Sequence, residues 1–254
     1  MKIEDFKITN LFDLDQTIAK DLLEKYEYPW EVLPHIEEFI LELGPKLPKD
    51  EYELRGENVW VHKTATIFDT AYIKGPAIIG KNAEIRQCAF IRGKAIIGEN
   101  TVVGNSTEVK NSIFFNEAKA PHYNYVGDSI LGYKSHMGAG SITSNVKSDK
   151  TNVQIKVKEV KSKEVCAESL TPNEKLNYNG QLKTKVEKGE KIIETNLRKV
   201  GAFLGDGVEV GCNSVLNPGT IIGKNTNIYP LSCVRGVIPE NSIYKNQNDI
   251  VEKH

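Results

Sequence analysis

Three cations recur at an interval of eighteen residues, and a histidine follows them. Lys74, Arg92 and Lys110 keep this spacing, and His122 comes twelve residues after Lys110. If eighteen residues complete one coil of the chain, the three cationic side chains stack above one another, about 4.8 Å apart. Stacked like charges repel, so a bound anion such as a phosphate would stabilise the column. The alternative is that the long side chains splay into water.

His122 could act as a base beside this column. The pKa of an imidazole suits proton transfer near neutral pH, and an amine that attacks a thioester must lose a proton. His122 lies in the segment Ala120-Pro121-His122-Tyr123-Asn124-Tyr125, near the end of the cation column. A single histidine in a loop is otherwise an ordinary polar surface residue, and both interpretations remain open from the residues alone.

The elements that must position these side chains are six-residue repeats. From Val61 to Phe115 every sixth residue is apolar, and a second block keeps the interval from Leu204 to Val234. A small residue, usually Ala, Ser or Thr, comes four residues after most of the large ones. This period fits neither an α-helix nor a half-buried strand, but it fits a chain that turns a corner after each short strand. We therefore expect a mainly β protein, a parallel β-helix with the large residues inside and three corners per coil.

The frame breaks between the two blocks. After Phe115 the next apolar position should be 121, yet the pattern resumes at Tyr125 and continues through Leu131, Met137 and Thr143. We infer that four extra residues bulge out here and carry His122 with them. Several glycines follow the large residues, where a corner could need unusual backbone dihedrals. They are Gly80, Gly98, Gly104, Gly132, Gly138, Gly211 and Gly223.

Residues 1–59 are predicted to form a helical cap before a β-helix domain of residues 60–245. Asp13 could cap a helix that runs to about Tyr26, with Gln16 completing a capping box. A second helix is expected from about Trp30 to Leu43. Its buried face would contain Leu33, Ile36, Phe39, Ile40 and Leu43. The cap would cover the open end of the β-helix or, alternatively, contact the substrate.

Residues 146–200 lose the six-residue interval and are predicted to leave the β-helix as an excursion. Val153, Ile155 and Val157 alternate with polar residues, as in an exposed strand, and Tyr178-Asn179-Gly180-Gln181 is typical of a hairpin turn. Such an excursion could act as a lid or specificity element, or it could be decoration without a role in catalysis.

Composition excludes several classes of protein. The formal net charge is −1, so the basic excess of a nucleic-acid-binding protein is absent. Neither a signal peptide nor a membrane span is recognisable. The four cysteines, Cys88, Cys166, Cys212 and Cys233, show no CxxC spacing. We expect a reduced, cytoplasmic protein.

Two stretches resemble a known family. His122-Tyr-Asn-Tyr-Val-Gly-Asp128 and Gly138-Ala-Gly-Ser-Ile-Thr-Ser-Asn145 are similar to the acetyltransferase domain of the bifunctional N-acetylglucosamine-1-phosphate uridyltransferase/glucosamine-1-phosphate N-acetyltransferase. That domain is one of the hexapeptide-repeat acyltransferases, and the similarity runs from Arg92 to about Pro230 except in the excursion. The resemblance implies a left-handed β-helix, a homotrimer and acetyl-CoA as co-substrate.

The resemblance also implies roles for individual residues. His122 would be the general base, Arg92 and Lys110 would bind a sugar phosphate, and Tyr125 would contact the sugar. Lys199 would lie near the substrate, as would His136, which replaces a family asparagine. The coenzyme side would contain Ala139, Asn145, Val146, Cys212 and Pro230. Here Cys212 replaces a family serine and Pro230 a small residue.

The expected activity is therefore acetyl transfer from acetyl-CoA to an amino-sugar phosphate, similar to glucosamine 1-phosphate, or to a nucleotide amino sugar. Residues 1–59 are too few for a nucleotide-binding domain, so uridyl transfer is not expected. One alternative is a metalloenzyme like the γ-carbonic anhydrases, which need three histidines. The spacing of His62, His122 and His136 does not suggest such a metal site. Another alternative is a non-catalytic β-helix with a role in assembly or regulation.

Overall fold

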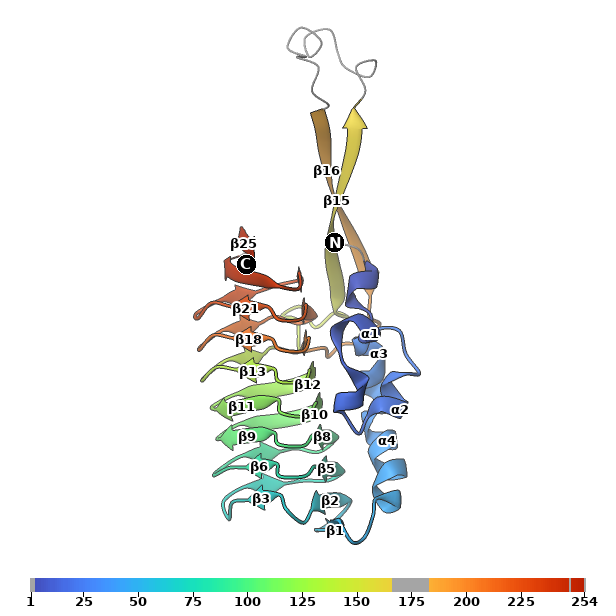
Figure 1. The fold of residues 1–254 in the computed structure, drawn as a ribbon, viewed down its shortest axis with the longest axis vertical. Coiled ribbons are helices and arrows are strands. Elements are labelled where there is room, and N and C mark those ends of the chain that lie inside the picture. The colour runs from blue at the N-terminus through green and yellow to red at the C-terminus, as the bar shows by residue number, and fades with distance from the viewer. Residues whose placement is uncertain (1–2, 166–182, 247, 254) are drawn as a thin grey trace, which may run out of the picture.

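The β-helix predicted from the repeats is the core of the structure. The computed structural model describes residues 3–165, 183–246 and 248–253, which wind through about eight coils of a left-handed parallel β-helix (Figure 1). Strands of successive coils pair in parallel and build three flat faces. The fold class expected from the sequence is confirmed.

Each face is a stack of short strands from successive coils. Face 1 contains β2 (Val59–His62), β5 (Ala77–Ile79), β8 (Ala95–Ile97), the second halves of β10 (Glu108–Phe114) and β12 (Tyr125–Leu131), β17 (Ala202–Leu204), β20 (Thr220–Ile222) and β23 (Val237–Ile238). Face 2 contains β3 (Thr66–Ile67), β6 (Glu84–Ile85), β9 (Val102–Asn105), β11 (Lys119–His122), β13 (His136–Met137), β18 (Glu209–Val210), β21 (Asn227–Ile228) and β24 (Ser242–Asn246). Face 3 contains β4 (Tyr72–Ile73), β7 (Phe90–Ile91), the first halves of β10 and β12, β14 (Ile142–Thr143), β19 (Val215–Leu216) and β22 (Cys233–Val234).

The frame break is a shortening of the coil, and the predicted bulge is wrong. Glu108 pairs with Tyr125 and Ala95 with Ser112, so these coils contain seventeen residues where the first coils contain eighteen. Phe114 and Val126 therefore point into the core, where the sequence frame placed Phe115 and Tyr125. One residue lost per coil moves each later position by one and leaves the prism closed.

The corners use asparagine more than glycine for the left-handed backbone. Asn82 and Asn100 both have φ of 54°, and the side-chain amide of Asn82 donates to Asn100 Oδ1 at 3.2 Å. None of the glycines named from the sequence has a positive φ. A Cβ on Gly98 would lie 2.7 Å from the carbonyl carbon of Phe115 in the next coil. These glycines are therefore required by the close approach of neighbouring coils, and the predicted dihedral role is wrong.

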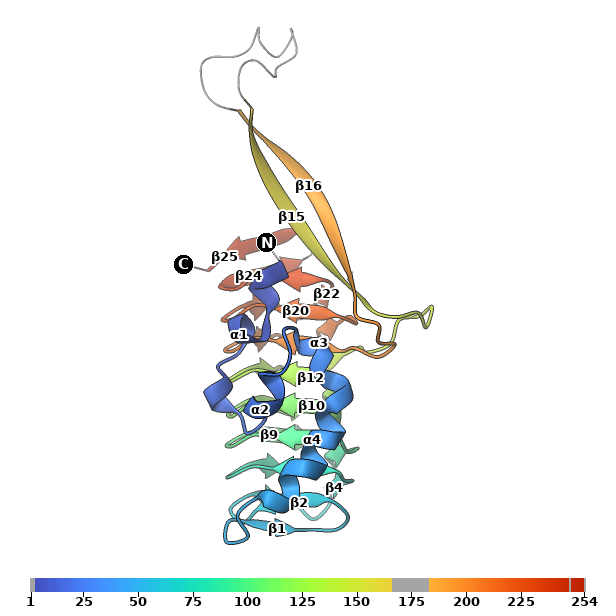
Figure 2. The same ribbon diagram turned by 90° about the vertical axis from the view of Figure 1, so that its right-hand side faces the viewer.

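The N-terminal helices cover face 1 and leave the open end alone (Figure 2). Face 1 presents an outward apolar surface as well as an inward one, and residues such as Ile96 and Phe115 are fully buried under the helices. The rings of Phe12 and Phe115 stack with centroids 5.0 Å apart. The expected covering of the open end is therefore wrong, because the outward side of face 1 is apolar and attracts the helices.

Short helices make up this layer. The second predicted helix, from Trp30 to Leu43, is divided into α3 (Pro29–Val32), a 3₁₀ turn η3 (Leu33–His35) and α4 (Ile36–Leu43). Asp13 accepts a hydrogen bond from the N–H of Asp15, but a 3₁₀ turn follows it where a helix to Tyr26 was predicted. The elements are η1 (Ile3–Phe6), α1 (Ile8–Leu11), η2 (Leu14–Gln16), α2 (Lys20–Leu23), α3 (Pro29–Val32), η3 (Leu33–His35), α4 (Ile36–Leu43) and η4 (Gly44–Lys46). None of the helices in the described ranges is long and apolar enough to cross a bilayer.

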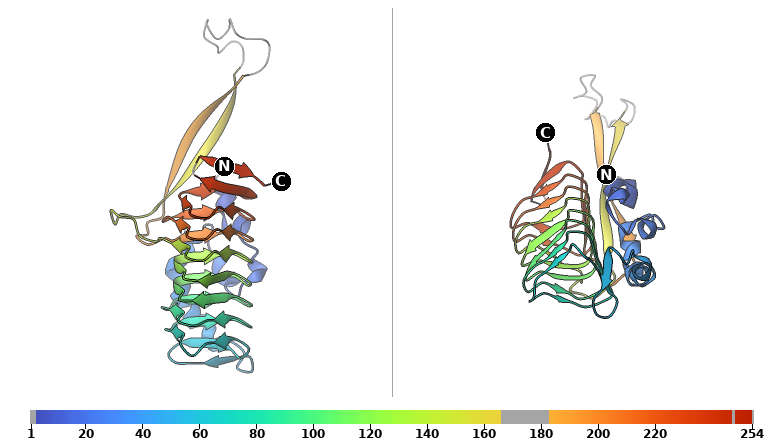
Figure 3. Two further views of the ribbon diagram at one scale, coloured as in Figure 1. Left: turned by 90° about the vertical axis from the view of Figure 1, so that its left-hand side faces the viewer. Right: turned by 60° about the horizontal axis from the view of Figure 1, so that its bottom comes forward.

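The excursion is a long hairpin that projects beside the β-helix (Figures 1 and 3). Its strands are β15 (Gln154–Val165) and β16 (Lys183–Glu194), paired antiparallel. Val153, Ile155 and Val157 are buried in the same apolar layer as the helices, so the predicted exposed strand is wrong at the base of the hairpin. The predicted turn at Tyr178–Gln181 lies outside the described residues.

Hairpins close both ends of the described β-helix. At the N-terminal end β1 (Tyr52–Leu54) pairs antiparallel with β2, and at the C-terminal end β25 (Asp249–Glu252) pairs antiparallel with β24. An antiparallel strand supplies partners for the backbone groups that a terminal coil would otherwise expose. The ends are thus protected by local hairpins.

The position of the helical layer predicts a difference between neighbouring residues of α4. Ile40 is fully buried against face 1, and Leu41 is 41% exposed. We expect Ile40→Ala to lower the free energy of unfolding by about 2–5 kcal/mol, because it leaves a cavity in the interface. Leu41→Ala, the matched control, should change it by less than about 0.5 kcal/mol. Denaturant titration measures both, and equal losses would contradict the packing of α4 on face 1.

Candidate active site

Face 3 carries two columns of outward side chains. The register stacks Tyr72, Phe90, Glu108, Tyr125, Ile142, Val215 and Cys233 in the first column. Two residues further along each strand, Lys74, Arg92, Lys110 and Gly127 form the second column. The intervening residues, such as Ile91 and Val109, point into the core. The vertical stacking of Lys74, Arg92 and Lys110 predicted from their spacing is therefore present.

Two of these cations already have carboxylate partners. Arg92 Nη1 lies 2.6 Å from Glu108 Oε1, and Lys110 Nζ lies 3.2 Å from Asp128 Oδ2. The hydrogen bond that Arg92 donates to Glu108 raises the pKa of the guanidinium further. The repulsion expected within the column is thus compensated inside the chain, and it does not by itself require a bound anion. The side chain of Arg92 remains 46% exposed, so donors remain free to bind a ligand.

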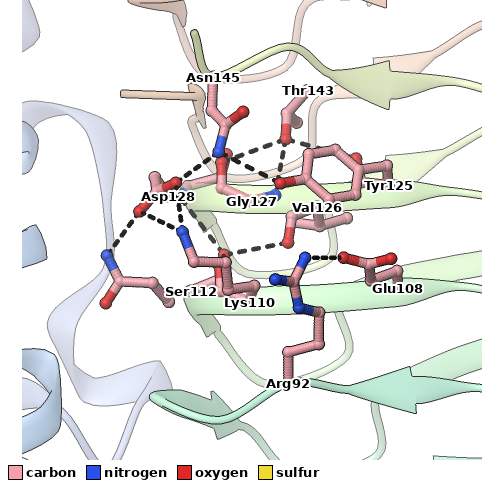
Figure 4. Close-up of polar contacts among 12 residues, drawn as sticks. Arg92, Glu108, Lys110, Ser112, Tyr125, Val126, Gly127, Asp128, Thr143 and Asn145 are labelled. Atoms are coloured by element: carbon pink, nitrogen blue, oxygen red, sulfur yellow. Dashed lines mark hydrogen bonds and ion pairs between the residues drawn. The ribbon is translucent and has the colours of Figure 1, made fainter. Parts of the chain in front are cut away.

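Asp128 is the centre of the polar cluster (Figure 4). Its carboxylate is buried and accepts hydrogen bonds from Lys110 Nζ, from Asn111 Nδ2 at 2.8 Å and from Asn145 Nδ2 at 2.5 Å. The residue occupies a corner with φ of 51° between face 3 and face 1. Because its partners come from the coil before and the coil after, this one carboxylate ties three successive coils together.

Tyr125 lies along face 3 beside this cluster (Figure 4). Gly127 makes room for it, since a Cβ there would collide with the Tyr125 hydroxyl. The hydroxyl accepts a hydrogen bond from Asn145 Nδ2 at 3.2 Å. Burial, followed by the nearby charge of Asp128, raises the pKa of Tyr125. The phenol therefore stays protonated at neutral pH and can donate to a ligand.

His122 belongs to a different column. It ends β11, at the corner where face 2 turns into face 3, and its side chain is exposed. Its carbonyl oxygen accepts the N–H of Gly140, the carbonyl of Ala139 accepts that of Asn213, and the carbonyl of Cys212 accepts that of Leu231. His122, Ala139, Cys212 and Pro230 are thereby stacked at one corner. The predicted base and three of the predicted coenzyme residues share this column.

The two groups lie at opposite edges of face 3. Lys110 and Asp128 are at the corner with face 1, and His122 is at the corner with face 2. Tyr125, at the start of the face 3 strand, lies between them. Asn145 lies with Lys110 and Tyr125, although the resemblance placed it on the coenzyme side.

The remaining predicted residues lie around these groups. His136 is on face 2, where its Nδ1 is 2.9 Å from Glu209 Oε2. Val146 follows Asn145 and is exposed, and Lys199 is exposed beside Val200, whose N–H bonds the carbonyl of Asn145. The excursion therefore begins and ends at the cluster around Asp128. Val146 and Lys199 thus lie next to the cluster around Asp128, whereas His136 lies away from it on face 2.

Three residues of the cluster were missed in the sequence. Asp128 ends the first stretch that carries the resemblance, but no role was assigned to it. Glu108 and Asn111 flank Lys110, and the alternation of the strand would have placed Glu108 on the same face as Lys110. The seventeen-residue coil hid the contact of Asn111, which pairs in register with Asp128.

The metalloenzyme alternative finds no support in the geometry. His62 is buried in β2 on face 1, with its Nδ1 2.9 Å from Thr64 Oγ1. His122 and His136 lie in different strands of face 2. In the part of the chain that the structure describes, no three histidine, cysteine or acidic side chains are grouped to hold a metal ion.

The cluster predicts a specific effect of removing one charge. An amide at position 128 has one oxygen and one NH₂ group, so it would turn a donor towards Lys110, Asn111 or Asn145. We expect Asp128→Asn to lower the free energy of unfolding by about 1.5–3 kcal/mol, the range for hydrogen bonds to charged groups. The matched control is Asp69→Asn at an exposed aspartate, which should change it by less than about 0.5 kcal/mol. Equal unfolding midpoints for the two variants would show that Asp128 does not hold the coils.

Comparison with known proteins agrees with the resemblance seen in the sequence. Residues 73–181 match the family model described as the GMPPB C-terminal domain. The bifunctional protein GlmU of Methanococcus aeolicus is 32% identical over 153 residues, which cover 60% of this chain and 29% of that protein. A bifunctional sugar-1-phosphate nucleotidylyltransferase/acetyltransferase of Sulfurisphaera tokodaii is 30% identical over 143 residues, 56% of this chain and 28% of that protein. The chain thus spans less than a third of the length of these relatives, and over its β-helix it is similar to these bifunctional proteins.

Proposed function

We propose that this protein is an N-acetyltransferase that moves the acetyl group of acetyl-CoA to the amine of a phosphorylated amino sugar. The observation that carries the proposal is the arrangement around face 3. Arg92, Lys110 and Tyr125 line one part of this face, and the column of His122 and Ala139 lines its other edge. The similarity to proteins named as acetyltransferases supports the same activity.

In the proposed reaction Arg92 and Lys110 hold the sugar phosphate, and Tyr125 contacts the sugar ring. The amine nitrogen attacks the thioester carbonyl carbon and forms the new C–N bond. His122 removes a proton from the nitrogen. Collapse of the tetrahedral intermediate breaks the C–S bond and releases the thiolate of CoA, which takes the proton that His122 removed from the amine. The products are the N-acetylated sugar and free CoA.

Charge on the thioester oxygen in the intermediate needs a hydrogen-bond donor. Ala139 is stacked on His122, and within the described residues its backbone N–H donates to no protein acceptor. We infer that this N–H binds the oxygen. Cys212, the next residue of the column, is exposed and is a weaker donor than a hydroxyl. Together with Pro230 it would line the path of the coenzyme along this corner.

A homotrimer is part of the proposal. The helices and the hairpin base bury the outer side of face 1, so faces 2 and 3 are the faces of the prism left uncovered for another copy. The two groups at the edges of face 3 form an open surface in one chain. A neighbouring copy would close it into a cleft, as expected for a site between subunits of the resembling family. Light scattering of the purified chain measures this assembly.

Removing the imidazole tests the proposed base. His122→Ala is expected to lower kcat by about 10²–10⁴-fold, the usual contribution of general base catalysis, with little change in the affinity for acetyl-CoA. His35→Ala, in the helical layer on face 1, is the control and should keep full activity. Release of free CoA thiol measures kcat, and calorimetry measures acetyl-CoA binding. An unchanged kcat in the His122 variant would remove this residue from the mechanism.

Removing a guanidinium tests the proposed phosphate contact. Arg92→Ala is expected to raise KM for a phosphorylated acceptor by roughly 10- to 150-fold, because a charge-assisted hydrogen bond is lost. KM for the dephosphorylated amino sugar should change little. The control is Arg86→Ala, which breaks a similar arginine–glutamate pair, with Glu84 at 2.9 Å, on face 2. The same increase for both acceptors would show that Arg92 does not bind the phosphate.

A non-catalytic β-helix is the second candidate, because Arg92 and Lys110 already have carboxylate partners inside the chain. A site that has lost its substrate could keep such pairs for stability alone. Titration with acetyl-CoA distinguishes the two: an enzyme binds it saturably, and a purely structural β-helix does not.

A further inference from the structure

The first column of face 3 contains an exposed aromatic pair below the proposed site. Tyr72 is 63% exposed and Phe90 is 37% exposed. Their ring centroids are 5.8 Å apart, with an angle of 51° between the ring planes. On face 2 the outward column contains mostly polar residues, including Thr66, Glu84 and Lys119. Tyr123 and Tyr229 are also exposed, but in the described part of the chain Tyr72 and Phe90 are the two exposed rings that contact each other.

The aromatic pair lies beside cations. Lys74 and Arg92 follow Tyr72 and Phe90 by two residues on the same strands, so their side chains point out of the same face. Lys74 is exposed and has no ion pair with any residue that the structure describes. A flat apolar surface next to one free and one partly free cation complements a ligand that combines an aromatic ring with phosphate groups.

The spacing connects this surface to the proposed sugar site. Phe90 pairs directly with Glu108, and Glu108 pairs with Tyr125. With about 4.8 Å between strands, roughly 10 Å separate the coil of Phe90 from that of Tyr125. A diphosphate that starts at a sugar beside Tyr125 can pass over Arg92 and Lys74 and bring a base to the two rings.

We infer that the acceptor is a nucleoside diphosphate amino sugar, with its base stacked on Tyr72 and Phe90 and its diphosphate on Lys74 and Arg92. This inference rests on the proposed function and selects between the two acceptor classes that the sequence left open. Stacking uses the π-face that every base has, so the pair selects for a nucleotide without choosing its base.

The test compares two acceptors in the full chain with acetyl-CoA. Glucosamine 1-phosphate ends at its phosphate, and UDP-glucosamine carries a diphosphate and a base. We expect a lower KM for UDP-glucosamine. Tyr72→Ala and Phe90→Ala should each raise that KM by about 5- to 150-fold and leave the KM for glucosamine 1-phosphate unchanged. Tyr72→Phe keeps a ring and should retain the low KM. Leu54→Ala, at another exposed apolar residue, is the control.

Several outcomes would overturn the inference. Equal KM values for the two acceptors in the wild type, with no change in the alanine variants, would leave the proposed function intact and remove the nucleotide site. A change of oligomeric state in the alanine variants, seen by light scattering, would show that the rings are a contact between copies.

Binding of UDP alone, measured by calorimetry, separates the inference from the proposed function. Binding that weakens in Tyr72→Ala, in a chain that acetylates neither acceptor, would support the nucleotide site and reject the acetyltransferase. Absence of UDP binding to the wild-type chain would overturn the nucleotide site.

Discussion

The buried carboxylate of Asp128 holds the centre of this molecule together. It accepts hydrogen bonds from Lys110, Asn111 and Asn145, which belong to the coils on either side of its own. Its backbone carbonyl accepts the N–H of Gly201, where the chain returns from the hairpin. A charge this well buried is stable only when its donors are in place. Asp128 therefore joins the end of the excursion to the β-helix through its backbone carbonyl and fixes the position of Lys110 on face 3 through its carboxylate.

The length of each coil determines which residues meet. Coils of seventeen residues replace coils of eighteen where Glu108 pairs with Tyr125, and the core stays filled because Phe114 and Val126 turn inward. The change brings Asn111 into register with Asp128 and places Gly127 above Lys110. The tyrosine ring can then lie in the space that a longer side chain would occupy. A small change in repeat length thus creates the polar cluster without disturbing the prism.

The three faces of the prism have different roles because their outward residues differ. Face 1 is apolar on both sides, so the N-terminal helices and the base of the hairpin bury it. Face 2 is mostly polar outside, with pairs such as His136 and Glu209. Face 3 combines aromatic rings with cations and stays uncovered in one chain. Of the three faces of the prism, faces 2 and 3 therefore remain open to a ligand in one chain.

The sequence by itself determined the β-helix, since a six-residue period of large apolar residues allows few other folds. It also determined the stacking of Lys74, Arg92 and Lys110, because these lie in coils of regular length. Tertiary structure alone decided the rest. The shortened coil moved His122 out of the predicted bulge and into β11, at the far edge of face 3 from Lys110. The partners of Arg92 and Lys110 are carboxylates whose positions depend on pairing between coils. The N-terminal helices pack on face 1 because its outward apolar residues form one continuous surface. That surface exists only after the coils have stacked, so the sequence alone does not show it.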